Sequence, residues 1–400
     1  MNVERREQVV MCVIGTRPEM IKMAPLIDAL RARPEAPTVK VVYTGQHKEL
    51  LDDMAVYFGI EADVNLEVMG KGTSLAHNAS LILEKLDAVI ARFAPDIVVG
   101  QGDTTSAMCA ALAAFSRGVR FAHVEAGLRS PDISSPFPEE GHRRLISALT
   151  WAHFAPTRSA IDNLLEENIP SERIFCTGNT VIDALEMVAN CGMSCPPALE
   201  GVRDPILLTL HRRENHGKIA RDIFQAVRDL ARYYPDQTFV YPVHPNPAVK
   251  SLAHEILGES QNVILTPPMS YGEFVYTMKH ARFILTDSGG VQEEAPSLGV
   301  PVFVLREETE RPEGIAAGAA ALIGTSPAAL IATVARALGN PLMLERMRRA
   351  NSPYGDGVAA ERCAEVLMTG RLTDPFGAPT RAHHTRETQP ANFEVASCVS

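Results

Sequence analysis

Residues 9–20 read VVMCVIGTRPEM, and this stretch sets the architecture expected for the whole chain. The apolar run that ends at Ile14 has the length and composition of a buried strand. Gly15 and Pro18 then predict a turn into a helix, because proline's missing N–H costs nothing in a first helical turn. Similar runs alternate with helical periods along the chain, which predicts parallel β-sheets covered by helices. They lie at 39–45, 96–103, 120–127, 205–214, 238–245, 262–268, 282–290 and 301–314.

The length of 400 residues leaves room for two domains. The clearest break is at 190–205, NCGMSCPPALEGVRDP, which is rich in Gly, Pro and small residues and divides the strands into two groups. A last helical segment is expected from about Val358 to Thr369. Beyond Asp374 apolar periodicity stops, so we expect a disordered tail there and no loss of stability on truncation at Asp374.

Composition excludes several classes of protein. With 38 Lys and Arg against 48 Asp and Glu, the net charge is −10, which argues against a nucleic-acid partner. No apolar stretch reaches membrane-spanning length and no signal peptide is evident, so we expect a cytoplasmic protein without a membrane partner. The seven scattered cysteines suggest reduced thiols, and the close pair Cys191 and Cys195 lacks further ligands for zinc, so no metal site is expected.

Polar clusters directly follow or end the expected strands. In open parallel sheets the carboxyl ends of the strands line the ligand crevice, so clusters from both halves are expected to meet in one cleft between the domains. They occupy residues 15–19, 101–105, 123–127, 211–214 and 287–290.

The sequence SGG at 288–290 is the better of two candidate phosphate-binding turns. Small residues allow close backbone approach, and the helix that follows favours negative charge at its N-terminus. Glu293 and Glu294 fall in that first turn, where a carboxylate can accept from ribose hydroxyls or simply complement the helix dipole. The other turn carries Arg17 and Lys22, which suit an anion but can equally be solvent-facing charges.

Three acids of the first half, Asp103, Glu125 and Glu139, come from separate loops, and Arg143 follows Glu139 by one helical turn. Carboxylates gathered in a partly desolvated cleft can divide acid and base work, and an arginine can keep one of them ionised. Taken alone, these three acids read better as solvated loop acids. His211, at a strand end, can protonate or hydrogen-bond a departing phosphate, or be a structural histidine.

Several fingerprints are absent from the sequence. No G-x-G-x-x-G follows a strand, and neither a P-loop, an H-E-x-x-H nor a G-x-S-x-G occurs. NAD binding, P-loop ATP hydrolysis, zincin chemistry and nucleophile-elbow hydrolysis therefore lose support.

Taken together, an ordered series of motifs from about residue 9 to 370 resembles the non-hydrolysing UDP-N-acetylglucosamine 2-epimerases. An ordered series of this kind is far more specific than any single motif. The motifs are GTRPEMIKMAPL, TGQH, GDTTS, HVEAGLRS, PFPEEGHRR, TGNTVIDAL, HRREN, YPVHPNP, LTDSGGVQEEAPSLGVPV and ERPEG.

The resemblance implies an α/β fold of two Rossmann-like, doubly wound domains with an interdomain cleft, the GT-B-like arrangement. The first domain is expected at 1–187 with the catalytic carboxylates, and is joined by the C-terminal helix at about 356–372. The UDP-binding domain is expected at 188–355, and a disordered tail at 373–400.

The resemblance also implies the chemistry. The C2 proton of the sugar has no adjacent carbonyl to acidify it, so the family eliminates UDP to give 2-acetamidoglucal and adds it back with protonation on the opposite face. No cofactor is expected, and a cytoplasmic homodimer that supplies N-acetylmannosamine for cell-surface polysaccharide is implied. Acid and base roles fall to Asp103, Glu125 and Glu139, with Arg143 as their cationic partner and His211 assisting the departing UDP; the C2 base stays open among the acids.

The resemblance further implies a set of substrate-binding residues. Arg17, Ser288, Gly289 and Gly290 would hold the pyrophosphate, Glu294 the ribose, Phe274 the uracil region and Arg311 a further part of the substrate, with Lys22 and His244 as additional contacts.

The alternatives differ in product or in class. A hydrolysing relative would release N-acetylmannosamine and UDP, and a related epimerase would act on a further modified UDP sugar. A glycosyltransferase would share the fold but leave the carboxylates unexplained, and a non-catalytic UDP-sugar sensor would not need them. The chain departs from the family pattern at Phe137, where Trp is frequent, and at His142, where an Asn-like residue is frequent.

A third departure carries a prediction. Family members that are activated by a second UDP-N-acetylglucosamine carry Gln in the loop where this chain has Thr73. We expect weaker dependence of the reverse reaction, from UDP-N-acetylmannosamine, on added UDP-N-acetylglucosamine. Initial rates with and without the activator measure this, and strict dependence would refute it.

Overall fold

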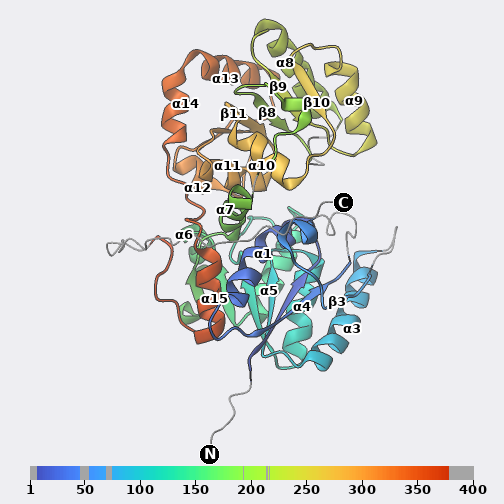
Figure 1. Cartoon of the computed structure of the whole chain (residues 1–400), viewed down its shortest axis with the longest axis vertical. Coiled ribbons are helices and arrows are strands. Elements are labelled where there is room, and N and C mark those ends of the chain that lie inside the picture. The colour runs from blue at the N-terminus through green and yellow to red at the C-terminus, as the bar shows by residue number, and fades with distance from the viewer. Residues whose placement is uncertain are drawn as a thin grey trace, which may run out of the picture.

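The structure is a computed structural model that describes residues 7–45, 54–68, 74–191, 193–212, 215 and 217–377. Two parallel β-sheets with helices on their faces form two lobes stacked along the long axis of the molecule (Figure 1). This confirms the α/β fold class expected from the alternating strand and helix patterns. Thr73 and the last 23 positions, 378–400, lie outside the described residues.

The first sheet has seven strands in the order β3-β2-β1-β4-β5-β6-β7. Most of its strand residues are apolar and buried under helices, which is why the sequence runs are continuous rather than alternating. The strands are β1 Val9–Ile14, β2 Thr38–Tyr43, β3 Val64–Asn65, β4 Ile97–Gln101, β5 Arg120–Val124, β6 Ala152–Ala155 and β7 Ile174–Cys176. The helices of this lobe are α1 Arg17–Arg31, α3 Leu75–Phe93, α4 Thr105–Ser116, α5 Glu139–Leu149 and α6 Arg158–Glu166.

The second sheet has six strands in the order β10-β9-β8-β11-β12-β13. Its strands are β8 Ile206–Thr209, β9 Phe239–Pro242, β10 Val263–Thr266, β11 Phe283–Thr286, β12 Val302–Val304 and β13 Ala320–Leu322. The helices are α8 Lys218–Tyr233, α9 Pro247–Leu257, α10 Tyr271–Lys279, α11 Gly289–Ser297, α12 Pro312–Ala316, α13 Pro327–Gly339 and α14 Pro341–Arg348.

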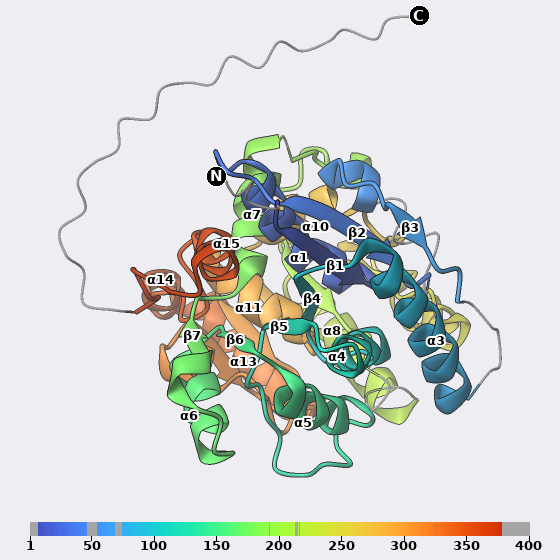
Figure 2. The same cartoon turned by 90° about the horizontal axis from the view of Figure 1, so that it is seen from below.

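Helix α7, Thr180–Cys191, carries the chain from the first lobe to the second and packs on α1 as well as on α10 and α11. One apolar cluster runs from the first sheet through Val181 and Leu185 of α7 to Val275 and Val291 of the second lobe. The chain then returns, and its last helix, α15 Ala359–Thr369, packs against α1 and α7 (Figures 1 and 2). The two lobes are therefore joined by a packed core and not by a bare linker.

Strand order reverses between β1 and β4 in the first sheet and between β8 and β11 in the second. At such switch points the loops after neighbouring strands diverge and leave a crevice. The turn after β1 holds Arg17, the turn after β4 holds Asp103, and the turn after β11 holds 288–290. The topology thus brings the predicted polar clusters of both lobes to one cleft.

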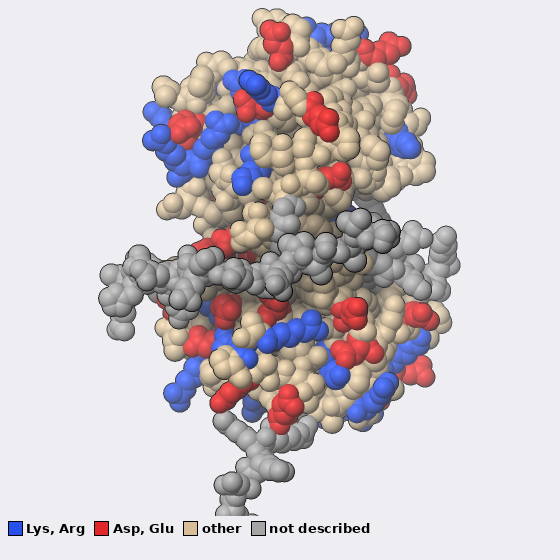
Figure 3. All heavy atoms as spheres, in the orientation of Figure 1, with Lys and Arg blue, Asp and Glu red and all other residues tan. Residues whose placement is uncertain are grey.

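Charged side chains of both signs are interspersed on the face shown in Figure 3, with basic ones more concentrated over α13 and α14. Among the described residues, no single helix is long and apolar enough to span a membrane, and only α13 with α14, bent by 92° at their break, passes that test by length and composition.

The structure corrects the expected start of the tail. Residues 373–377 lie on the first lobe: the Phe376 N–H donates to the Cys176 carbonyl at 2.8 Å, and Arg362 Nε donates to the Asp374 carbonyl at 2.6 Å. The Arg362 guanidinium lies 5.8 Å from the centre of the Phe376 ring. Sequence reasoning missed this contact because residues after α15 show no periodic pattern.

Truncation after Asp374 is therefore expected to lower stability, contrary to the expectation from sequence. Removing Phe376 deletes a half-buried ring, its contact with Arg362 and one backbone hydrogen bond, so we expect a loss of about 1 kcal/mol in the free energy of unfolding. Urea denaturation measures it, with truncation after Gly377 as the matched control. Equal midpoints for the two truncated chains would contradict the prediction.

Candidate active site

A cavity of about 590 Å³ lies between the two lobes. This volume is in the range of sites that enclose a small molecule or cofactor. Four of the predicted residues line it from the first lobe, Arg17, Lys22, Asp103 and Glu125. Eight line it from the second lobe, His211, His244, Phe274, Ser288, Gly289, Gly290, Glu294 and Arg311.

Glu139 and Arg143 of α5 are not among the lining residues, and of the two only Arg143 contacts the site, through Asp103. Arg143 Nη2 lies 2.7 Å from Asp103 Oδ2, and Arg143 Nε donates to the same oxygen at 2.9 Å. Glu139 begins α5, and its Oε2 is buried with no hydrogen-bond partner among the described residues. His142 of the same helix donates through Nδ1 to the Asp103 carbonyl at 2.8 Å, so α5 holds the Asp103 loop at two atoms.

Glu125 directly follows β5 and is the most enclosed of the three predicted acids. Its carboxylate meets Lys22 Nζ at 2.5 Å and accepts hydrogen bonds from the side-chain amides of Gln101 and Asn179. Burial raises the pKa of Glu125, and the Lys22 charge opposes that rise. Its φ of 63° lies in the left-handed region, which a residue with a Cβ adopts only when its surroundings hold it there.

Lys22 is buried, although lysine is rarely so. Besides Glu125 it contacts Glu293 of the second lobe, with Nζ to Oε2 at 3.3 Å. Burial works to lower the pKa of Lys22, but the two carboxylates outweigh it and the pKa is raised. Lys22 is therefore a fixed positive charge in the wall between the lobes.

His211 follows β8 and is held by Asp287 at the end of β11. The His211 Nδ1 to Asp287 Oδ1 distance is 3.0 Å, and the backbone N–H groups of His211 and Arg212 also donate to the Asp287 carboxylate. Asp287 is fully buried; burial raises its pKa, but the hydrogen bonds and the His211 charge outweigh this and lower it. An imidazole anchored in this way presents a defined edge to the cavity.

The turn at 288–290 begins α11 as the sequence predicted, with Ser288 as the N-cap whose side chain accepts from the Val291 N–H at 3.5 Å. A Cβ on Gly289 would lie 2.7 Å from the Arg311 guanidinium, so a larger residue here would force the arginine side chain to shift. Helix N–H groups and an adjacent arginine together favour an anion.

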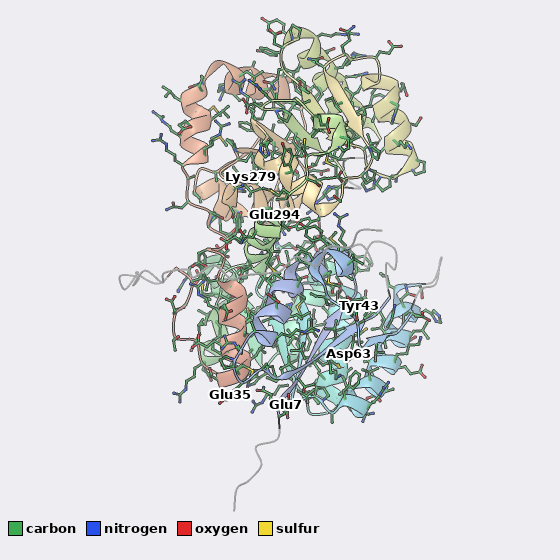
Figure 4. The ribbon with its side chains drawn as sticks, in the orientation of Figure 1. Glu7, Glu35, Tyr43, Asp63, Lys279 and Glu294 are labelled. Carbon is green, nitrogen blue, oxygen red and sulfur yellow. The ribbon has the colours of Figure 1, made fainter. Side chains whose placement is uncertain are left out.

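Glu294, one turn into α11, lies at the edge of the second lobe next to the first (Figure 4) and lines the cavity. Its Oε2 is buried without a hydrogen-bond partner among the described residues. Burial, reinforced by the Glu293 charge, raises the pKa of Glu294 to about 8. A carboxyl group in this state can exchange hydrogen bonds with the hydroxyl groups of a ligand in the cavity.

Within the described residues, no group of His, Cys, Asp and Glu is arranged to hold a metal ion. Sequence reasoning assigned no role to Asn179, Gln101 or Asp287, although 101 and 287 fall in two of the polar clusters. It left Glu293 open between a ribose contact and a helix-dipole complement. Asn179 and Asp287 do lie inside the quoted motifs TGNTVIDAL and LTDSGG, but their partners are distant in sequence, so no spacing rule connects them.

Two parallel-sheet domains meet over one cavity, which carboxylates line on one side and glycine, arginine and histidine line on the other. This arrangement defines an α/β enzyme of the GT-B-like class. The sequence profile of the UDP-N-acetylglucosamine 2-epimerase family matches residues 28–368. The chain belongs to the UDP-N-acetylglucosamine 2-epimerase family, which confirms the resemblance found in the motifs.

Named relatives agree with this assignment. The UDP-N-acetylglucosamine 2-epimerase of Salmonella typhimurium is 46% identical over 374 residues, which cover 91% of this chain and 99% of that protein. The UDP-GlcNAc 2-epimerase of Neisseria meningitidis, solved bound to UDP-GlcNAc, superposes with a TM-score of 0.84 at 42% identity, over 90% of this chain and 100% of that one. An S. aureus structure with UDP gives a TM-score of 0.86 at 40% identity, over 92% and 100%.

Proposed function

We propose that this chain interconverts UDP-N-acetylglucosamine and UDP-N-acetylmannosamine by eliminating UDP to give 2-acetamidoglucal and adding it back. The observation that carries the proposal is the two-sided cavity. Acid side chains of the first lobe face the glycine turn, arginine and histidine of the second lobe across one space. The N. meningitidis and S. aureus relatives, solved with UDP-GlcNAc and UDP, support the choice of ligand.

The first lobe supplies the proton transfers. As a carboxylate removes the C2 proton, the C–H electron pair forms the C1–C2 double bond, and the electron pair of the C1–O bond leaves with UDP. In the second half UDP attacks C1 again, and a carboxyl group delivers a proton to the other face of C2. Asp103, Glu125 and Glu139 are the candidates, and carboxyls in different surroundings can divide the two roles.

The second lobe holds the departing group. Arg311 lies against the glycine turn at 288–290, and Arg17 of the first lobe lines the same cavity, so the diphosphate that develops negative charge meets fixed positive charge and helix N–H groups. His211, anchored through Nδ1 to Asp287, donates to the same group. We assign Phe274 to the uracil end, Glu294 to the ribose, and Lys22 and His244 to further contacts.

Product analysis tests the proposal. Purified protein is incubated with UDP-N-acetylglucosamine and the nucleotides are separated by anion exchange. An epimerase leaves a mixture of the two UDP sugars without accumulation of free UDP. Accumulation of UDP with free N-acetylmannosamine favours the hydrolysing alternative, and no reaction with this substrate favours the modified-sugar alternative.

The proposal includes a homodimer that acts in the cytoplasm. Support for an interface comes from Phe115 of α4 and Leu145 of α5, which are 61% and 57% exposed on two helices that pack against each other. Sedimentation equilibrium of the purified chain gives the oligomeric state directly.

A further inference from the structure

Behind the cavity wall, the carboxylate of Glu293 joins side chains from both lobes. It accepts from Arg311 Nε at 2.6 Å through Oε1, and from Lys22 Nζ at 3.3 Å and Asn179 Nδ2 at 3.2 Å through Oε2. Glu293 itself is 2% exposed and is not among the residues that line the cavity. It is therefore surrounded by site residues without being in a position to contact a ligand.

Lys22 links Glu293 to Glu125. Its ammonium group lies 2.5 Å from the Glu125 carboxylate and 3.3 Å from that of Glu293, so one cation is shared between an acid of each lobe. Asn179 repeats this connection, since its Nδ2 donates to Glu125 at 3.3 Å as well as to Glu293. The orientation of Glu125 consequently depends on a carboxylate that belongs to the other lobe.

The same cluster reaches the two points where the chain passes between the lobes. Asn179 immediately precedes α7, the first crossing, and its backbone N–H donates at 2.7 Å to the carbonyl of Tyr354, which lies on the returning segment. The Tyr354 hydroxyl donates to the Arg311 carbonyl at 3.3 Å. A change in the angle between the lobes would therefore move Arg311 and Asn179, and with them the contacts that they make to Glu293.

We infer that Glu293 is a positioning residue whose carboxylate holds Lys22 and Arg311 in place. Through these contacts, the position of the second lobe relative to the first sets the orientation of Glu125. This inference rests on the proposed function, because it matters only where Glu125 acts on the sugar. Buried partners of this kind commonly set a reactive group's geometry without touching the substrate.

The charge of Glu293 also acts on Glu125. Burial is the largest cause that raises the pKa of Glu125, Lys22 opposes it, and the Glu293 charge raises it further. Burial would raise the pKa of Glu293 too, but Arg311 and Lys22 outweigh it, so Glu293 stays ionised. Removing the Glu293 charge therefore lowers the pKa of Glu125 in two ways. Glu125 is no longer repelled by a second carboxylate, and Lys22 then pairs with Glu125 alone. The charged or titratable groups that face Glu293 are Lys22, Glu125, Glu294, Arg311 and Tyr354.

The test compares Glu293→Gln and Glu293→Asp with the unaltered chain and with Glu255→Gln, a control from an exposed ion pair with Arg221. In Glu293→Gln, kcat is expected to fall by about tenfold to a hundredfold. The limb of the kcat/KM pH profile that titrates Glu125 is expected to move to lower pH by about one unit, whichever protonation state the reaction uses. Glu293→Asp keeps the negative charge, so the same limb of its pH profile is expected between the limbs of the unaltered chain and of Glu293→Gln.

A merely structural role would change stability and the amount of active protein but leave the pH profile in place. A Glu293→Gln profile that superposes on that of the unaltered chain, with UDP binding intact, overturns the inference. If Glu293→Gln does not fold, the Glu293→Asp variant tests the inference. Unchanged kcat and an unchanged pH profile overturn the inference, and lower kcat with a displaced limb of the pH profile supports it. Absence of turnover in the unaltered chain is a different result, since it overturns the proposed function and the inference with it.

Discussion

Replacing Glu125 with Gln is expected to lower kcat for epimerisation by about a thousandfold, within the range for loss of a general acid or base. The variant keeps the shape of the side chain and its place between Lys22, Gln101 and Asn179, but it cannot exchange a proton with C2. Lys22 retains Glu293 as a partner, so the fold is expected to survive. The anomeric proton signals of the two UDP sugars measure the rate.

A matched control for this variant is Glu167→Gln. Glu167 forms an ion pair with Arg129 at 2.6 Å in the same lobe but does not line the cavity. UDP affinity measured by calorimetry shows whether the binding lobe is intact. Wild-type turnover in Glu125→Gln, with normal UDP binding in both proteins, would remove Glu125 from the chemistry.

Replacing Asp103 with Asn is expected to lower kcat by about a hundredfold to ten thousandfold. Asp103 lines the cavity and is 27% exposed, and its carboxylate is oriented by two contacts to Arg143. The amide keeps one oxygen for Arg143 but cannot take or give a proton. The measurement is the rate of deuterium exchange at C2 in D₂O, started separately from each of the two UDP sugars. It shows whether exchange slows for one epimer more than for the other.

That readout distinguishes a proton-transfer role from a binding role. Loss of exchange from one epimer only would assign Asp103 to one face of C2, and equal loss from both would place it at a shared step. The control is Asp87→Asn, which breaks an exposed pair with Arg117 on the same lobe. Unchanged turnover in Asp103→Asn would contradict the assignment of this residue to the catalytic group.

The alternation of strands and helices and the position of the cleft were predictable because both follow from local patterns. The run ending at Ile14 leads into the turn that holds Arg17, and the run at 282–290 leads into the turn that holds Ser288 and Gly289. Parallel packing then brings the carboxyl ends of the strands together without further information. Twelve of the fourteen site residues that the resemblance implied line the cavity, and the exceptions are Glu139 and Arg143.

The remaining contacts depend on how the two lobes meet, and a sequence pattern does not encode that. Glu293 reads as one of two adjacent acids in a first helical turn, yet Glu294 faces the cavity while Glu293 pairs with Lys22, 271 positions earlier. Asn179 and Tyr354 meet for the same reason, at the two crossings between the lobes. The side of the helix on which each acid lies became evident only from the packed structure.

Proton NMR of the chain with UDP-N-acetylglucosamine in D₂O follows the decisive atom, because elimination and re-addition must pass the C2 proton through the protein to solvent. We expect UDP-N-acetylmannosamine to appear with deuterium at C2, and UDP-N-acetylglucosamine recovered at equilibrium to carry deuterium there as well. UDP-N-acetylmannosamine that retains the original C2 proton would rule out elimination and re-addition.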